Sequence, residues 1–362
     1  MIERELSNEV ALVQDDGSLN FNAVGWARRP LVDTVGIGST SNGGIASRLK
    51  WKQHRWGRNK RWEYWNIMTP THILAVVVSS LDYAAVNEVW IFDRNTEQVW
   101  TESMTTLPSR GVQLPTRLGA GPIRVTTKGL DIEITHEPSG ANASTDSAGA
   151  NYAGTITIRA KINNASFEIQ VDRAVNHDCL AVVVPWNEHT YQYTVKDVAL
   201  PARGTLTVDG IKHELQEGES WAILDHGRGR WPYDVRWNWG AGSGVSGGRT
   251  IGIQVGGQWT RGTGSTENGV LVDGHLHKIS EELTWSHGLP DDWRSPWTIV
   301  GGGFEATFTP FYDKVTRTNL GLLAGSTDQC FGTWSGDLVT ANSERISFEG
   351  IEGFAEEVHN RW

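Results

Sequence analysis

Apolar and polar side chains alternate in short runs along almost the whole chain, and this period of two constrains the fold more than any other feature. In the segment 155–162, "TITIRAKI", Ile156, Ile158, Ala160 and Ile162 fall on one face of a strand. Asp-Gly pairs, which are typical of hairpin turns, separate several of these runs. The pattern predicts an all-β chain of sandwiches or barrels with very little helix; a short helix is expected only near 283–285.

The chain is long enough for two domains of ordinary size. The segment 59–81 holds "KRWEYWNI" followed by an apolar strand, and 235–257 holds "VRWNWGAG" followed by "RTIGIQVGG". This weak echo favours an internal duplication, with two β-domains in tandem at 1–195 and 196–362. Residues 138–154 are rich in small side chains and are expected to form an exposed loop.

Composition adds one constraint on function. The chain has 18 tryptophans, and each indole buries a large area and carries an N–H group that needs a partner. This aromatic surface exceeds what one small core uses, so we expect it to line a large apolar cavity.

Charge and targeting signals exclude other classes. The formal net charge of −10 disfavours a nucleic-acid partner, although the run 48–62 is basic and aromatic. Two cysteines, Cys179 and Cys330, are too few for a disulfide framework. No apolar run is long enough to span a membrane, and the charged start has no signal-peptide core, so we expect a cytoplasmic protein.

The stretch 225–244, "DHGRGRWPYDVRWNWGAGSG", concentrates residues that could carry chemistry. A strand here would turn Trp237 and Trp239 to one face and Asn238 to the other. Asp225 and His226 follow an apolar strand and could stand at the mouth of a barrel as an acid and a proton relay. In the alternative interpretation, Asp225 caps a turn and nearby arginines pair with carboxylates.

A second candidate acid is Glu63, in "NKRWEYWNIMTP". Alternation places it on the face of Trp65, with Tyr64 on the opposite face. A carboxyl group between ring faces loses solvation and retains its proton nearer neutral pH. The alternative is a structural Glu63 paired with Arg61 or another arginine.

Motifs for metal or cofactor chemistry are weak. His275 and His277 share a strand face, a spacing also found in metal sites, but no third ligand of suitable spacing is evident. Phosphate-loop, dinucleotide-binding and nucleophile-elbow motifs are missing from the sequence. We therefore expect no metal and no cofactor.

The motifs "WEYW", "DHGRGRWPYDVRWNWGAGSG", "TENGVLVDGHLHKI" and "FGTWSGDLV" occur in this order. By these motifs the chain resembles a bacterial and fungal family in which the central motif recurs. That family is distantly similar to carotenoid hydratases and tocopherol cyclase. The resemblance covers roughly residues 15–362. It implies two tandem lipocalin-like antiparallel β-barrels, or a barrel and a curved sandwich, with an aromatic cavity and one or a few acids.

The expected activity is a cofactor-independent hydratase, dehydratase, isomerase or cyclase that acts on a C=C bond or tertiary alcohol of a hydrophobic, isoprenoid-like molecule. Asp225 and Glu63 are the candidate acids, and His226 is the candidate relay. The following residues are expected to line the cavity: Tyr64, Trp65, Trp231, Tyr233, Trp237, Asn238 and Trp239.

Two other classes stay open. A carrier for a lipid, terpenoid or pigment would use the same cavity without chemistry. A glycan-cleaving protein would hold two carboxylates roughly 5–9.5 Å apart across an open cleft. The sequence leaves the substrate, the reaction direction and the oligomeric state undetermined.

Overall fold

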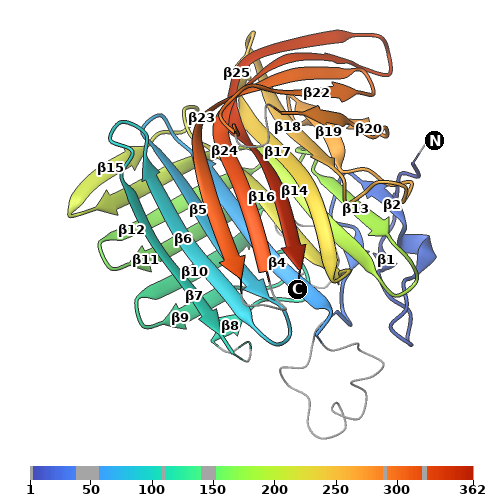
Figure 1. Cartoon of the computed structure of the whole chain (residues 1–362), viewed down its shortest axis with the longest axis horizontal. Helices are drawn as coiled ribbons and strands as arrows, with labels where there is room; N and C mark the ends of the chain where they lie inside the picture. Colours follow the sequence, from blue (N-terminus) through green and yellow to red (C-terminus); the bar gives the residue numbers. More distant parts are fainter. Residues whose placement is uncertain are drawn as a thin grey trace, which may run out of the picture.

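The structure is a computed structural model that describes residues 3–37, 57–107, 109, 111–139, 152–287, 292–319 and 324–361. Within these ranges the chain is all-β, and its helix is limited to the 3-10 turn η1 (Phe21–Ala23). Two curled sheets form half-barrels, which confirms the predicted fold class (Figure 1). None of the described residues forms a helix long and apolar enough to cross a membrane.

The larger sheet has fourteen strands, with the main order β7-β6-β5-β4-β16-β14-β12-β11-β10-β9-β8 and with β13, β15 and β2 attached at β14 and β13. Its strands are β2 (Gly25–Ala27), β4 (Asn59–Met68), β5 (His72–Ser80), β6 (Ala85–Asp93), β7 (Val99–Thr106), β8 (Val112–Gln113), β9 (Ile123–Thr127), β10 (Leu130–Pro138), β11 (Gly154–Ile162), β12 (Ala165–Arg173), β13 (Leu180–Pro185), β14 (Tyr191–Val208), β15 (Ile211–Leu215) and β16 (Trp221–Arg230). A separate parallel pair joins β1 (Val10–Ala11) to β3 (Val32–Asp33).

The second sheet has nine antiparallel strands in the order β20-β19-β18-β17-β25-β24-β23-β22-β21. These are β17 (Asp234–Ser246), β18 (Arg249–Gly257), β19 (Asn268–Val272), β20 (His275–Ile279), β21 (Thr284–Ser286), β22 (Trp297–Gly301), β23 (Phe304–Asn319), β24 (Ala324–Val339) and β25 (Arg345–Arg361). The expected short helix near 283–285 is wrong, because residues 284–286 pair with β22 as an edge strand.

The chain passes from the first sheet to the second between Arg230 and Asp234, whereas the predicted boundary after residue 195 falls inside β14. The division into two domains stays a prediction. Most of the small-residue segment 138–154 and the first part of the basic run 48–62 lie outside the described residues.

Two Asp-Gly pairs form the tight hairpin turns that the sequence predicts. Asp209 and Gly210 have φ of 48° and 81° and join β14 to β15. Asp273 and Gly274, with φ of 52° and 82°, join β19 to β20 in the same way. Positive φ at both central residues matches the right-handed twist of the flanking strands, so these pairs fix the register of each hairpin.

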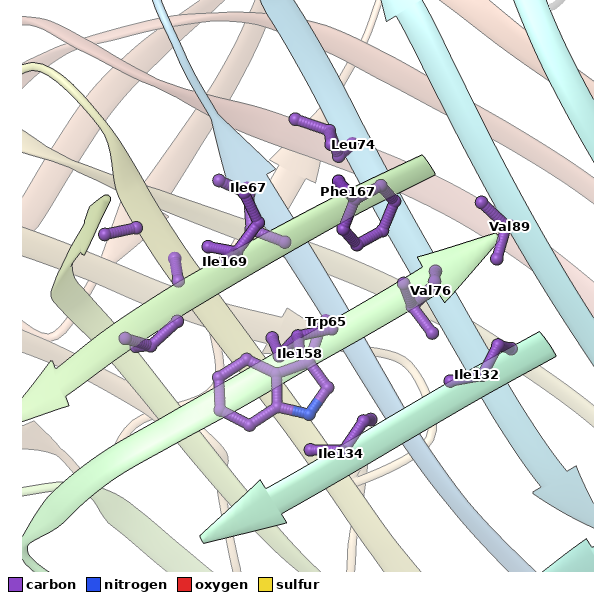
Figure 2. Close-up of a cluster of buried hydrophobic side chains, with 14 of the residues drawn as sticks. Trp65, Ile67, Leu74, Val76, Val89, Ile132, Ile134, Ile158, Phe167 and Ile169 are labelled. Atoms are coloured by element: carbon purple, nitrogen blue, oxygen red, sulfur yellow. The ribbon is translucent and has the colours of Figure 1, made fainter. Parts of the chain in front are cut away.

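One core fills the interior of the first half-barrel. Side chains of β4 to β6 face those of β10 to β12 (Figure 2). All four predicted apolar positions of β11 belong to this core. A second core lies between the two sheets and contains Tyr64, Trp231 and Trp239. In Figure 1, β23 to β25 pass in front of β4 to β6, and the ion pair Arg94–Glu352 joins the two sheets at 2.6 Å. Among the predicted cavity-lining residues, Trp65 belongs to the first core, and Tyr64, Trp231, Trp237 and Trp239 lie in or pack against the second.

Candidate active site between the sheets

Alternating glycines on β16 create the space for the site. Asp225, Gly227 and Gly229 point toward the second sheet, while His226 and Arg228 point into the first half-barrel. A Cβ atom at Gly227 would lie 2.1 Å from the Trp62 ring. The indole of Trp62 therefore lies flat across β16, and its Nε1 donates a hydrogen bond to Asp225 Oδ2 at 2.9 Å.

Glycines on β17 also leave space for an indole ring, on the face of the strand that points away from the first sheet. Trp237 and Trp239 face the first sheet, whereas Gly240 and Gly242 face the interior of the second half-barrel. A Cβ atom at either glycine would approach the Trp334 ring to within 3 Å. The glycines let a buried indole pack against β17 without moving the two tryptophans at the interface.

Asp225 is held by three donors. Besides Trp62, it accepts a hydrogen bond from Thr194 Oγ1 at 2.9 Å, and Lys196 Nζ lies 3.1 Å away. Lys196 and Asp225 are directly opposed on β14 and β16, so backbone pairing fixes this ion pair. Both side chains are nearly inaccessible to solvent.

Lys196 also reaches the second sheet. Its Nζ lies 3.5 Å from Glu267 Oε2 and 3.8 Å from the centroid of the Trp239 ring. Burial disfavours the ammonium form, but Asp225 and Glu267 outweigh this effect and raise the pKa of Lys196. Lys196 is therefore a fixed positive charge at the junction of the sheets.

Glu267 lies at the end of the connection from β18 to β19. Its Oε1 accepts a hydrogen bond from Trp259 Nε1 at 2.5 Å, and a Cβ atom at Gly256 would collide with its side chain. Burial raises the pKa of Glu267, although Lys196 acts in the opposite direction.

Glu356, on β25, is the third carboxyl group. It accepts hydrogen bonds from Trp237 Nε1 at 2.9 Å and from Gln329 Nε2 at 3.1 Å; Gln329 also bonds to the hydroxyl of Tyr64 on the first sheet. Burial raises the pKa of Glu356 to about 7, and the charge of Asp225 adds to this shift. A carboxyl group with this pKa is a proton donor near neutral pH.

The cluster therefore contains three buried carboxyl groups and one ammonium group. Asp225 and Lys196 come from the first sheet, Glu356 comes from β25 of the second, and Glu267 comes from the loop that leads into β19. Ionisation of all three carboxyls would leave an uncompensated negative charge in a poorly solvated place. The protonated form of Glu356 relieves this imbalance.

Indoles surround the acids. Trp231 is at the centre, with its ring 5.1–5.7 Å from four others (centroid to centroid), and it stacks on Trp259 at an interplanar angle of 18°. Three of its neighbours are partly exposed: Trp62, Trp186 and Trp237. Trp62 and Trp237 donate to Asp225 and Glu356, so the indoles connect the solvent-facing side of the cluster to its acids.

The structure separates the predicted catalytic residues. Glu63 on β4 and His226 on β16 point to the opposite face of the sheet from Asp225, and His226 Nδ1 is 3.0 Å from Glu63 Oε1. Trp65 is beside them in the core of the first half-barrel. Glu63 thus has a histidine partner and lies 4.0 Å from the Arg228 guanidinium, close to the structural alternative considered from the sequence.

The predicted cavity-lining residues also divide into groups. Tyr64, Trp231, Trp237 and Trp239 lie between the sheets. Asn238 points to the other side of β17, where it accepts from Gln258 Nε2 at 2.6 Å. Tyr233 is 40% exposed in the turn between the sheets.

Lys196, Glu267 and Glu356 are absent from the sequence prediction. Lys196 had a detectable signal, because it is a lone ammonium in the apolar strand "YTVKDVAL". Glu356 had a weaker one, in "GFAEEVH". The described residues contain no group of three or more His, Cys, Asp or Glu side chains arranged to hold a metal, and His275 and His277 lie on β20.

Fold and site together define a class of all-β proteins in which two curled sheets enclose an acidic, tryptophan-rich cluster. The chain belongs to the family described as "Domain of unknown function (DUF2804)", which matches residues 3–362. None of the curated protein sequences matches it significantly.

Solved structures share this fold. Kievitone hydratase from Nectria haematococca superposes with a TM-score of 0.52 at 13% identity, over 83% of this chain and 88% of that one. An AttH-like protein from Nitrosomonas europaea has the same TM-score at 10% identity, over 83% of this chain and 92% of that one. At these identities the similarity shows the fold.

Proposed function

We propose that this protein is an acid–base enzyme of the hydratase, dehydratase or cyclase type that acts on a C=C bond or tertiary alcohol of a small hydrophobic molecule. The observation that carries the proposal is Glu356, a buried carboxyl group whose pKa of about 7 keeps a proton available among indole rings. The hydratase with a similar fold supports the reaction class. The family that the motifs resemble is distantly similar to carotenoid hydratases and tocopherol cyclase, which is the ground for an isoprenoid-like substrate in this proposal.

The surroundings of Glu356 suit the chemistry of alkene protonation. Transfer of its proton to one carbon leaves a carboxylate and a carbocation. Indole faces stabilise such a cation by about 0.5–2 kcal/mol per contact, and the excess of carboxylates around Lys196 favours positive charge in the same place. A water molecule then forms the C–O bond and returns a proton to Glu356; dehydration is the reverse.

Each remaining residue of the cluster has a supporting role in this proposal. Asp225 fixes Lys196 and Trp62, and Glu267 balances the ammonium charge from the other sheet. Glu63 and His226 are on the wrong side of β16 to touch a molecule beside Glu356, so we assign them to a separate cluster.

The test begins with native mass spectrometry of freshly purified protein to identify a co-purified hydrophobic ligand. Incubation of that ligand with the protein in D₂¹⁸O should incorporate deuterium at the protonated carbon, and also heavy oxygen where the reaction adds or removes water. Glu356→Gln should slow this incorporation by the 10²–10⁴-fold typical of general acid–base catalysis. Glu357→Gln changes the neighbouring carboxylate on the other face of β25 and is the matched control. A ligand that stays unchanged through long incubation identifies a carrier and contradicts the proposal.

A further inference from the structure

The interior face of β16 carries a second buried polar cluster, separate from the acids between the sheets. Arg61, Arg228 and Tyr193 are directly opposed on β4, β16 and β14 and form a row across the sheet. Glu63 and His226 form the next row. Cβ atoms of directly opposed residues lie about 4.5–5.5 Å apart, so these side chains are immediate neighbours.

Four polar atoms of this cluster are buried without a hydrogen-bond partner: Arg61 Nε, Arg228 Nε, Tyr193 Oη and His226 Nε2. Arg228, Tyr193 and His226 are at most 2% exposed. A buried polar group without a partner costs about 1–3 kcal/mol, and more when it is charged. Four such atoms in two adjacent rows indicate that a bound polar molecule or ion makes the missing hydrogen bonds.

The charges specify what that species is. Arg228 donates to the carbonyl oxygens of Trp62, Gly227 and Pro115, which are neutral acceptors. The carboxylate closest to it, Glu63, lies 4.0 Å away and is shared with His226.

Arg61 adds a second guanidinium directly opposite Arg228, and like charges in opposed positions destabilise a sheet. The pKa of Arg228 is lowered to about 9, mainly by burial and in part by the charge of Arg61, while Glu63 acts in the opposite direction. The remaining acid near Arg61 is Asp82, whose Oδ2 is already bonded to the backbone N–H groups of Gly57 and Asn59. The row therefore has an excess of positive charge.

We propose that this row is a binding site for a small oxyanion, a carboxylate or phosphate, held between the Nε–H groups of Arg61 and Arg228 and by the hydroxyl of Tyr193. Charge-assisted N–H···O bonds are the strongest that these donors make, and guanidinium groups match the planar spacing of such oxygens. The site is independent of the proposed catalysis, because β16 separates it from Glu356.

The surroundings limit the size of the ion. The segment at Pro115 contacts Arg228. The next residues are bound to the end of β3 by the ion pair Arg117–Asp33, and the hydroxyl of Thr34, just after β3, donates to the Thr116 carbonyl. This segment covers Arg228, so in this proposal the site accepts a compact ion rather than a large ligand.

The test uses the full chain. Titration calorimetry with sodium phosphate and with sodium acetate, at constant ionic strength, should show saturable binding of one of the two ions. Crystals soaked in sodium selenate should give an anomalous peak between Arg61 and Arg228. Arg61→Met should weaken binding at least tenfold, and Tyr193→Phe, which keeps the packing, should weaken it several-fold.

Arg159→Met is the matched control, because Arg159 is half-exposed on another strand, with Glu133 and Glu168 as partners, and its loss should leave the affinity unchanged. Ordered water without an anomalous peak would overturn the proposal. Binding that persists at equal strength in both the Arg61 and Tyr193 variants would mark an adventitious ion only, and would also overturn it.

Discussion

Asp225 and His226 are consecutive in the chain, but their side chains enter two buried clusters on opposite faces of β16 that carry opposite excess charge. Asp225 joins Lys196 and the carboxyls between the sheets. His226 joins Glu63 beside two guanidinium groups. A single strand therefore separates an acidic environment from a basic one, and each cluster can be tested by itself.

The raised pKa of Glu356 makes stability depend on pH. Its value in the unfolded chain is near 4.5 and its folded value is about 7, so the folded state binds more protons between these limits. The contribution of Glu356 to stability is therefore largest at low pH within this window and falls as the pH rises from about 4.5 to 7, by at most roughly 3 kcal/mol at 1.36 kcal/mol per pKa unit. Burial lowers the pKa of His226 to about 4, which makes an opposite contribution over the same range. Urea unfolding across this range measures the slope, and Glu356→Gln should make it more positive, because the loss of stability that Glu356 causes with rising pH is removed. An equal slope in the variant would show that another group titrates.

Lys196→Met should raise the pKa of Glu356 further, because the ammonium group now favours its carboxylate form. The same change leaves Asp225 and Glu267 without their cation and should cost roughly 3–5 kcal/mol. Carbon-13 NMR titration of the glutamate carboxyls measures the pKa, and chemical unfolding measures the stability. Lys196→Arg keeps the charge and should keep the pKa near its original value. Lys212→Met, at an exposed pair with Glu214, is the control for loss of a lysine.

Gly227→Ala should displace the Trp62 indole and break its hydrogen bond to Asp225, because the new Cβ would lie 2.1 Å from the ring. Overpacking of this kind typically costs about 1–3 kcal/mol. Thermal unfolding and the tryptophan emission spectrum report the two effects. Gly244→Ala is the matched control, since its Cβ would meet its nearest atom at an ordinary 3.4 Å. Equal melting temperatures for the two variants would contradict the steric argument.

Arg94 and Glu352 should show a measurable coupling across the two sheets. Their two hydrogen bonds, at 2.6 and 2.8 Å, are bidentate, and both side chains are partly shielded from solvent. A double-mutant cycle with Arg94→Met and Glu352→Gln should give a coupling energy of about 1 kcal/mol, the upper part of the range for partly exposed pairs. The more exposed pair Arg159–Glu168, within one sheet, should give less.

The fold could be predicted from sequence because period-two alternation recurs in nearly every strand. The same period places Glu63 with Trp65 and turns Trp237 and Trp239 to one face, as the structure shows. It also implies that adjacent Asp225 and His226 point apart, so their grouping as one catalytic pair did not follow from the pattern.

Lys196 and Glu356 could not be assigned in this way. Lys196 stands out as a lone ammonium in an apolar strand, and Glu356 lies in a strand with an ordinary pattern, but neither segment identifies the charges on the facing sheet with which its side chain interacts. The proton affinity of Glu356 depends on that long-range packing, and no short segment of the chain contains this information.

Because Glu356 belongs to one sheet while the charges that tune it belong to the other, its protonation is thermodynamically linked to any relative movement of the sheets. A shift that takes Asp225 and Lys196 away from Glu356 changes how firmly the proton is held. By reciprocity, gain or loss of that proton changes the free energy of the shift by the same amount. The pKa of Glu356 therefore depends on the distance between the two sheets.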